Sequence, residues 1–155
     1  MRKLGKFILS ILLPLAIGFF ASFFTQQSVE TWYKLIDKPV FNPPDWIFAP
    51  VWTILYIIIG IAFYLVWQKN FGSDKKRVLT IYFVQLFLNF LWSFLFFGMQ
   101  SPIAGLVEII LLWIVIFMNI KVFYRVTKTA GYLLIPYLAW VSFALILNFS
   151  IVIIN

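Results

Sequence analysis

Five long apolar runs alternate with short polar segments along the chain. The runs cover residues 4–24, 46–68, 78–97, 102–124 and 131–154. Each is long enough to cross the hydrocarbon core of a bilayer, which takes about 20 helical residues. Strands of a membrane β-barrel would instead alternate polar and apolar residues over about 10 positions. The pattern predicts an all-α integral membrane protein, a single domain made of a five-helix transmembrane bundle.

The first run also has features of a secretory signal peptide. A basic start (Arg2, Lys3, Lys6) precedes it, and Ala16-Ile17-Gly18 is similar to a cleavage site. The apolar stretch nevertheless continues to Phe24, beyond the apolar core of about 7–15 residues that signal peptides have. We therefore expect this run to be a retained helix.

The composition indicates a membrane protein rather than a nucleic-acid-binding one. Of the 155 residues, 64% are hydrophobic and 11% are charged, whereas a soluble domain is about half apolar and a quarter charged. The formal charge of +7 comes from basic residues that sit in short segments between the apolar runs. We therefore expect the basic residues to interact with the lipid bilayer and not with nucleic acid.

The basic residues are unevenly divided between the two ends of the predicted spans. The end that includes the N-terminus carries Arg2, Lys3, Lys6, Lys69, Lys75, Lys76, Arg77, Lys121, Arg125 and Lys128. The other end carries Lys34 and Lys38. Because cytoplasmic segments collect Lys and Arg, the bias predicts a cytoplasmic N-terminus and an external loop over residues 25–45.

The chain contains no Cys and no His. This excludes disulfides, thiolate and imidazole metal ligands, and catalysis that depends on Cys or His. We therefore expect no metal site and no covalently bound cofactor.

The external loop is rich in aromatic residues and proline. Its first part, Ser28–Ile36, has apolar residues at helical spacing and a Glu30–Lys34 pair one turn apart, which predicts a short amphipathic helix. This helix is either an interfacial belt or a lid over a cavity. The segment Lys38–Trp52 contains four prolines, so we expect a rigid extended strap that holds its aromatic side chains in place.

Polar side chains in two later spans fall on stripes that we expect to face the bundle interior, because lipid penalises them. The stripe of the third span contains Tyr82, Gln85, Asn89, Trp92, Ser93 and Phe96. The fifth span places on one face Tyr137, Trp140, Ala144 and Asn148. These groups either hydrogen-bond neighbouring helices or line a ligand cavity. The small Ala144 is either a hollow in that cavity or an ordinary packing residue.

Two further features of the spans are an aromatic face in the second span and an acidic residue in the fourth. Trp52 and Tyr56 share a face of the second span, and Gly60 leaves a gap one turn later. Glu108 is the one acidic residue deep within a span. Its carboxyl is either a proton or cation site or a structural hydrogen-bond partner.

Four groups of residues, in chain order, resemble the translocator protein family, also called tryptophan-rich sensory proteins or peripheral benzodiazepine receptors. They are Trp32-Tyr33; a strap from Lys38-Pro39 through Pro43-Pro44, Trp46, Ala49-Pro50 and Trp52 to Leu55-Tyr56; Gln85-Leu86 with Asn89, Trp92 and Phe96-Phe97-Gly98; and Pro136-Tyr137-Leu138-Ala139-Trp140 with Phe143-Ala144 and Leu147-Asn148. The resemblance spans nearly the whole chain. It indicates a bacterial member of the family in the inner membrane.

The resemblance implies a bundle that binds porphyrins and drug-like aromatic ligands in a pocket under the first loop. The ligand-binding positions that it implies are Tyr33, Trp52, Asn89, Trp92, Trp140, Phe143, Ala144 and Asn148. Members of the family are also associated with cholesterol handling and with light-dependent breakdown of porphyrin.

The leading hypothesis is therefore a receptor, sensor or transporter for tetrapyrroles. Trp side chains would stack on the macrocycle, and Lys34 and Lys38 would meet its carboxylates. One alternative is an enzyme that degrades protoporphyrin IX oxidatively under light, with Trp52 and Trp140 as redox-active catalytic residues. A structural membrane scaffold without a ligand is the other alternative.

Two departures from the family's pattern limit what the resemblance implies. The cholesterol motif needs a Tyr followed by Lys or Arg near the C-terminus, but Phe149 replaces the Tyr and no basic residue follows Lys128. Some relatives form dimers through a Gly-x-x-x-Gly stripe in the third span, where this chain has Thr80 and Val84. Neither sterol recognition by that motif nor that dimer geometry is predicted. The oligomeric state, a homodimer included, stays open.

Overall fold

The computed structural model describes residues 2–155, and this part of the chain contains helices and connecting turns without any strand. The helices are α1 (Lys3–Val29), α2 (Trp32–Leu35), the 3₁₀ turn η1 (Asp45–Ile47), α3 (Phe48–Gln68), α4 (Lys75–Ser93), the π-helical turn η2 (Phe94–Gly98), α5 (Pro102–Val126), α6 (Lys128–Leu133) and α7 (Ile135–Ile154). The predicted all-α class is confirmed.

Five segments of the described chain are helical, long and apolar enough to span a membrane. They are Lys3–Val29, Asp45–Gln68, Lys75–Gly98, Pro102–Val126 and Lys128–Ile154, so the chain folds as the predicted five-helix transmembrane bundle. The last of them is interrupted at Leu134, between α6 and α7. Pro136 follows at once, in the first turn of α7, where its missing N–H is not needed.

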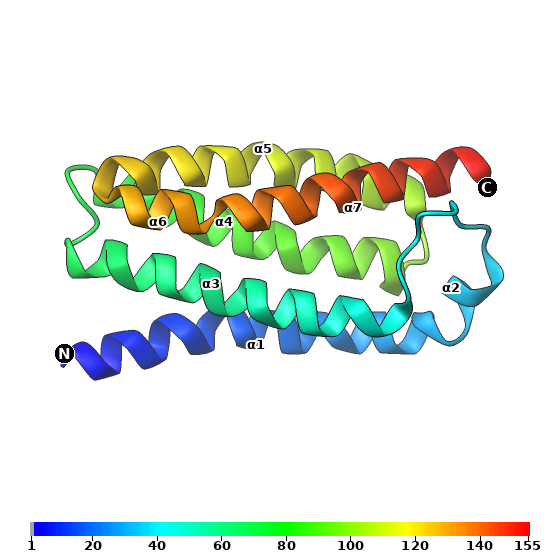
Figure 1. Ribbon diagram of the computed structural model, residues 1–155, viewed down its shortest axis with the longest axis horizontal. Helices are drawn as coiled ribbons and strands as arrows, with labels where there is room; N and C mark the ends of the chain where they lie inside the picture. The colour runs from blue at the N-terminus through cyan, green and yellow to red at the C-terminus, as the bar shows by residue number, and fades with distance from the viewer. Residues whose placement is uncertain (1) are drawn as a thin grey trace.

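The long helices lie side by side along the long axis of the molecule (Figure 1). α1 packs along α3, α4 packs along α5, and α5 also contacts α6 and α7. The N-terminus and the turn between α3 and α4 lie at one end of the bundle, whereas α2 and the C-terminus lie at the other. We call the second end the loop end, because the long segment between α1 and α3 covers it.

Two glycines allow α1 and α3 to approach each other closely. A Cβ on Gly60 would lie 2.5 Å from the carbonyl oxygen of Ser10 and 2.8 Å from the Cα of Ile11. The gap expected at Gly60 is therefore filled by the backbone of α1. On α1, Gly18 leaves the space that the Tyr56 ring occupies, because a Cβ there would lie 2.2 Å from Tyr56 Cε2.

The long loop begins later than the apolar pattern indicated. α1 continues to Val29, five residues beyond Phe24, and its last turn includes the buried Ser28. The Ser28 hydroxyl donates a hydrogen bond to the Phe97 carbonyl, which fixes this end of α1 against η2. The amphipathic helix expected over Ser28–Ile36 is consequently divided, and only the single turn of α2 remains separate.

The strap that follows α2 is held by side chains from two directions. Lys38 Nζ donates hydrogen bonds to the carbonyl oxygens of Tyr33 and Ile36, at 2.6 and 3.1 Å. The side chain of Asn155, after the end of α7, pairs with the backbone of Asp37. Its Oδ1 accepts from the Asp37 N–H at 3.0 Å, and its Nδ2 donates to the Asp37 carbonyl at 2.8 Å. The strap is thus fastened across the loop end.

Candidate functional site

Four buried polar side chains form a directed hydrogen-bond chain across the middle of the bundle. Tyr56 of α3 donates to Asn89 Oδ1 at 2.7 Å. Asn89 Nδ2 donates to the Tyr137 hydroxyl, which donates in turn to Gln85 Oε1, both at 2.8 Å. The chain joins α3, α4 and α7. Of the two interpretations of the third-span stripe, hydrogen bonding between helices therefore describes what Asn89 and Gln85 do here.

A second buried amide, that of Asn148, joins three helical segments nearer to the loop end. Its Oδ1 accepts from Trp92 Nε1 at 3.1 Å, and its Nδ2 donates to the Pro102 carbonyl at 2.9 Å. Gly105 makes room for this amide, since a Cβ at that position would lie 3.0 Å from Asn148 Oδ1. The bonds hold α7 against the beginning of α5 and place the Trp92 ring.

An aromatic cluster lies between this amide and the loop. Its buried members are Tyr33, Phe96, Phe97, Leu147 and Ile151. The Trp92 ring stacks on Phe96, with centroids 5.1 Å apart and an interplanar angle of 20°. The short helix α2 inserts Tyr33, which is 2% exposed and donates from its hydroxyl to Asn42 Oδ1 at 2.8 Å. Burial, and to a smaller extent the charge of Asp45, raises the pKa of Tyr33, so the phenol is neutral and remains a donor.

Aromatic side chains also fill the space between α3 and α7 at the loop end. The Trp140 ring lies 6.2 Å from Phe48 and 5.4 Å from Phe143, measured between centroids. Phe143 in turn meets Phe41 of the strap at 6.3 Å. The indole Nε1 of Trp140 is buried and has no hydrogen-bond partner within residues 2–155. It is therefore a donor directed into the protein without a protein acceptor.

Most of the eight predicted ligand residues contact one another or share a neighbouring side chain. Trp52 stacks on Tyr56, with centroids 5.6 Å apart, and so touches the hydrogen-bond chain that contains Asn89. Tyr33 belongs to the aromatic cluster and Trp92 packs against it. Asn148 accepts a hydrogen bond from Trp92, and the rings of Trp140 and Phe143 pack together. Ala144 is 9% exposed and lies one helical turn from both Trp140 and Asn148.

Three important residues of this region were not among the predicted ligand residues. Tyr56 and Tyr137 are members of the hydrogen-bond chain, and Phe96 is the stacking partner of Trp92. All three fall on the same helical stripes as the predicted residues. Their position on those stripes was therefore visible in the sequence, but their contacts with other helices were not.

The two lysines of the loop are already engaged within it. Lys34 pairs with the Glu30 carboxylate, and the hydrogen bond and charge of Glu30 raise the pKa of Lys34. Lys38 donates to two backbone carbonyls and lies 4.8 Å from the centroid of the Tyr33 ring. That the two ammonium groups meet ligand carboxylates stays a prediction.

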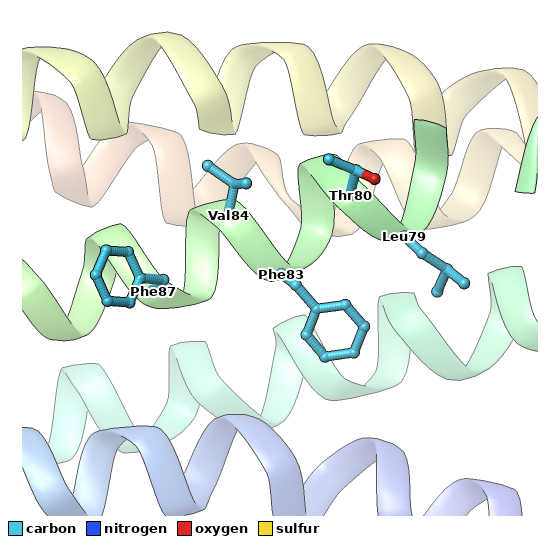
Figure 2. A pocket seen from close by; sticks show the side chains of 5 residues that line it. All are labelled: Leu79, Thr80, Phe83, Val84 and Phe87. Carbon is cyan, nitrogen blue, oxygen red and sulfur yellow. The ribbon is translucent and has the colours of Figure 1, made fainter. Parts of the chain in front are cut away.

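A hollow also lies elsewhere, on the outer surface of α4. It measures about 580 Å³ and is lined by Leu79, Thr80, Phe83, Val84 and Phe87. Figure 2 shows these five side chains leaving one helix in several directions. None of them belongs to the predicted ligand residues, and most are apolar, as is expected of a surface that faces lipid.

The fold and the residues at the loop end define a class of protein: a five-span helical membrane protein with aromatic and amide side chains gathered beneath a long loop. Its sequence matches the TspO/MBR family over residues 10–154, and the chain belongs to this family. The resemblance found in the sequence motifs is thereby confirmed.

Its relatives include prokaryotic and animal proteins. The chain is 53% identical to the tryptophan-rich protein TspO of Archaeoglobus fulgidus, over 97% of each chain. It is 50% identical to the tryptophan-rich protein TspO of Chlorobaculum tepidum, over 99% of this chain and 98% of that one. The human translocator protein is 36% identical over 86% of this chain and 80% of its own.

Proposed function

We propose that the protein is a membrane receptor, sensor or transporter that binds porphyrins and other flat aromatic molecules beneath the loop. The observation that carries the proposal is that three tryptophan rings pack against the buried cluster that contains the small Ala144. Trp52, Trp92 and Trp140 contact this cluster from three helices, and Phe143 packs on Trp140. Indole and phenyl faces stack on planar macrocycles.

The amides beside these rings support the same function. A ligand pocket is mostly apolar but contains a few polar groups that orient the ligand. Asn89 and Asn148 are buried in this position and are held by hydrogen bonds to Tyr56, Tyr137 and Trp92. The free N–H of Trp140 adds a donor for a ligand carbonyl, imine nitrogen or carboxylate.

The proposal is tested by titrating protoporphyrin IX into the purified protein in the dark. We expect saturable quenching of the tryptophan fluorescence. Trp140→Ala should weaken binding about tenfold, the value of one lost aromatic contact. Trp67→Ala is the control, because Trp67 packs on Phe63 and Phe71 at the opposite end of the bundle. Equal affinity of the Trp140 variant and the wild type would contradict the proposed site.

One observation favours the enzymatic alternative, in which porphyrin is degraded oxidatively under light. Trp52 is stacked on Tyr56, with an interplanar angle of 26°, and the Tyr56 hydroxyl donates to Asn89. An indole next to a hydrogen-bonded phenol is a pair of oxidisable groups beside the ligand. Replacing both Trp52 and Trp140 by Phe keeps the aromatic surface but removes the indoles.

The enzymatic alternative therefore predicts that the double Phe variant binds porphyrin but forms product more slowly under illumination. Chromatography of the pigment, in light and in dark, measures the product. An unchanged rate in the folded variant leaves only the binding role for these indoles. A protein that binds no porphyrin at all would instead support a structural scaffold.

A further inference from the structure

Glu108 is a buried acidic residue that has no role in the candidate site described above. It lies on the inward face of α5 and is 3% exposed. Neither of its carboxyl oxygens has a hydrogen-bond partner within residues 2–155. Buried polar groups are nearly always hydrogen-bonded, so a carboxyl without a partner in the protein points to a ligand or a proton.

Two hydrogen bonds between α5 and α7 bound the stretch of the two helices that contains Glu108 and Ala144. Trp113 Nε1 donates to Ser142 Oγ at 2.8 Å, and Asn148 Nδ2 donates to the Pro102 carbonyl at 2.9 Å. The two helices are antiparallel, so positions between these two contacts pair in reverse order. Glu108 lies midway between Pro102 and Trp113, and Ala144 and Leu145 lie midway between Ser142 and Asn148. The Glu108 carboxyl and Ala144 therefore lie in the same stretch of the α5–α7 contact.

No cation is available to balance a charge on Glu108. On α3, α4 and α7 the buried titratable groups are the phenols of Tyr56, Tyr82 and Tyr137. The basic and remaining titratable residues of α5 and α6 lie at the other end, exposed, and are Lys121, Tyr124, Arg125, Lys128 and Tyr132. An unpaired carboxylate in a membrane interior is strongly disfavoured, so Glu108 holds a proton and presents one O–H donor.

A metal ion does not fit the same group. The other buried polar side chain of α5 without partners is Asn119, which is 11 residues away and therefore about 16 Å along the helix. One ion cannot be bound by both. Glu108 is the single carboxyl in this part of the bundle, and the described residues contain no cluster of three acidic or other typical metal ligands.

We propose that Glu108 donates a hydrogen bond from the floor of the ligand site to an acceptor atom of a flat aromatic ligand. The matching acceptors are an imine nitrogen, as in a free-base tetrapyrrole, or a carbonyl oxygen of a drug-like molecule. The inference rests on the proposed function and names a specificity-determining residue for it.

The test compares the affinity of wild type, Glu108→Gln and Glu108→Leu for protoporphyrin IX over a range of pH. Gln keeps a neutral donor, so its affinity at neutral pH should match the wild type. Leu removes the donor and should bind about tenfold more weakly. As the pH rises and the Glu108 carboxyl loses its proton, the wild type should lose affinity relative to the Gln variant. The titration of the porphyrin itself is common to both proteins.

A second measurement needs no ligand. The infrared band of a protonated carboxyl group should be present in the wild type and in Glu30→Gln, and absent in Glu108→Gln. Glu30 is the matched control because it is the other glutamate of the chain and is exposed, paired with Lys34.

Three results overturn the inference. Leu at position 108 with wild-type affinity means that Glu108 does not touch the ligand. The same pH dependence of affinity in the wild type and the Gln variant means that no proton on Glu108 is involved in binding. This comparison tests the inference even when the Leu variant does not fold. A wild type that binds no porphyrin overturns the proposed function as well, whereas the first two results leave the proposed function standing.

Discussion

Asn89 illustrates how much one side chain determines in this protein. Its carbonyl oxygen accepts from Tyr56 and its amide nitrogen donates to Tyr137, so both ends of the amide are used. An ionised aspartate could not donate, and a leucine could neither donate nor accept. A buried amide with both ends satisfied specifies one arrangement of three helices, because any shift leaves a polar group unpaired in the bundle interior.

A substitution of another single residue, Ala144, tests whether this position borders a ligand site or only packs between helices. We expect Ala144→Phe to lower the affinity for protoporphyrin IX at least about tenfold, because the added ring occupies the face between Trp140 and Asn148. The residue is 9% exposed, so we also expect a destabilisation of about 1–3 kcal/mol, the usual result of overpacking. Titration and thermal unfolding on the same preparation measure both quantities.

Ala139→Phe is the matched control for Ala144→Phe. Ala139 is exposed on the outer face of α7, so the same added volume should change neither affinity nor stability. If the Ala144 variant keeps normal affinity while it remains folded, the ligand site lies elsewhere in the bundle.

Among the helices, the α1–α3 contact depends on the absence of a side chain at one position. The backbone of α1 at Ser10 and Ile11 occupies the space of the missing Gly60 Cβ. In a membrane, where helices gain little from burying apolar surface, such close backbone contact is a main source of association.

We expect Gly60→Ala to destabilise the protein by about 1–3 kcal/mol, because a rigid backbone, not a flexible side chain, must move to admit the methyl group. The thermal midpoint in detergent measures the change. Ile54→Ala on the same helix is the comparison, since Ile54 is 57% exposed and faces outward. A Gly60 variant as stable as the wild type would mean that α1 can shift without cost.

The loop is an element whose position depends on a contact far away in sequence. Asn155 pairs with both backbone groups of Asp37 and so fastens the strap over the aromatic cluster. Asn155→Ala should speed hydrogen exchange at the Asp37 amide about fivefold, which corresponds to the loss of roughly 1 kcal/mol of hydrogen bonding.

Mass spectrometry of the peptide that contains Asp37 measures this exchange. Ser150→Ala serves as the control, because the Ser150 hydroxyl bonds only to the Ile146 carbonyl of its own helix. Unchanged exchange in the Asn155 variant would show that the Lys38 hydrogen bonds alone hold the strap.

For the whole molecule, the main open property is its orientation in the membrane. The N-terminus and the turn between α3 and α4 lie at one end of the bundle (Figure 1). Most Lys and Arg residues belong to segments that the sequence assigns to this end, and the positive-inside rule predicts that it lies in the cytoplasm. The chain has no cysteine, so single cysteines can report each side. Val40 is fully exposed at the loop end, and Ser73 is exposed in the turn before α4.

We expect an impermeant thiol reagent, added to intact cells, to label Val40→Cys and to spare Ser73→Cys. Both variants should be labelled after the membrane is opened, which is the control for reactivity. Labelling of Ser73→Cys alone in intact cells would mean that the protein is inserted the other way round.

The sequence-based predictions and the structure agree best on features that depend on how a single segment interacts with the bilayer. The apolar runs predict the five spans because each run meets lipid on its own, independently of its neighbours. They predict the ends of the spans less well, and α1 continues to Val29 because Ser28 finds a partner in Phe97. The sequence of α1 contains no sign of that partner.

For the candidate site residues, the sequence alone likewise identified which face of each span points inward. Gln85, Asn89 and Asn148 are polar in an apolar span, so lipid excludes them from the outer face. Which groups they meet is a different matter. The bond from Asn89 to Tyr137 joins residues 48 positions apart, and that from Trp92 to Asn148 joins residues 56 positions apart.

The amino-acid pattern alone therefore determined the number of spans, the inward faces and, through its motifs, the family. The spans and their inward faces follow from the free energy of moving one segment from water into lipid, which is a sum over that segment's own residues, whereas the family follows from the motifs. Only the tertiary structure decided that α1 fills the gap at Gly60, that Lys38 bonds within the loop, that Asn155 fastens the strap and that the Glu108 carboxyl is left without a partner within residues 2–155. These depend on the relative rotation and register of packed helices, which arise from many side chains of different segments fitting together at once.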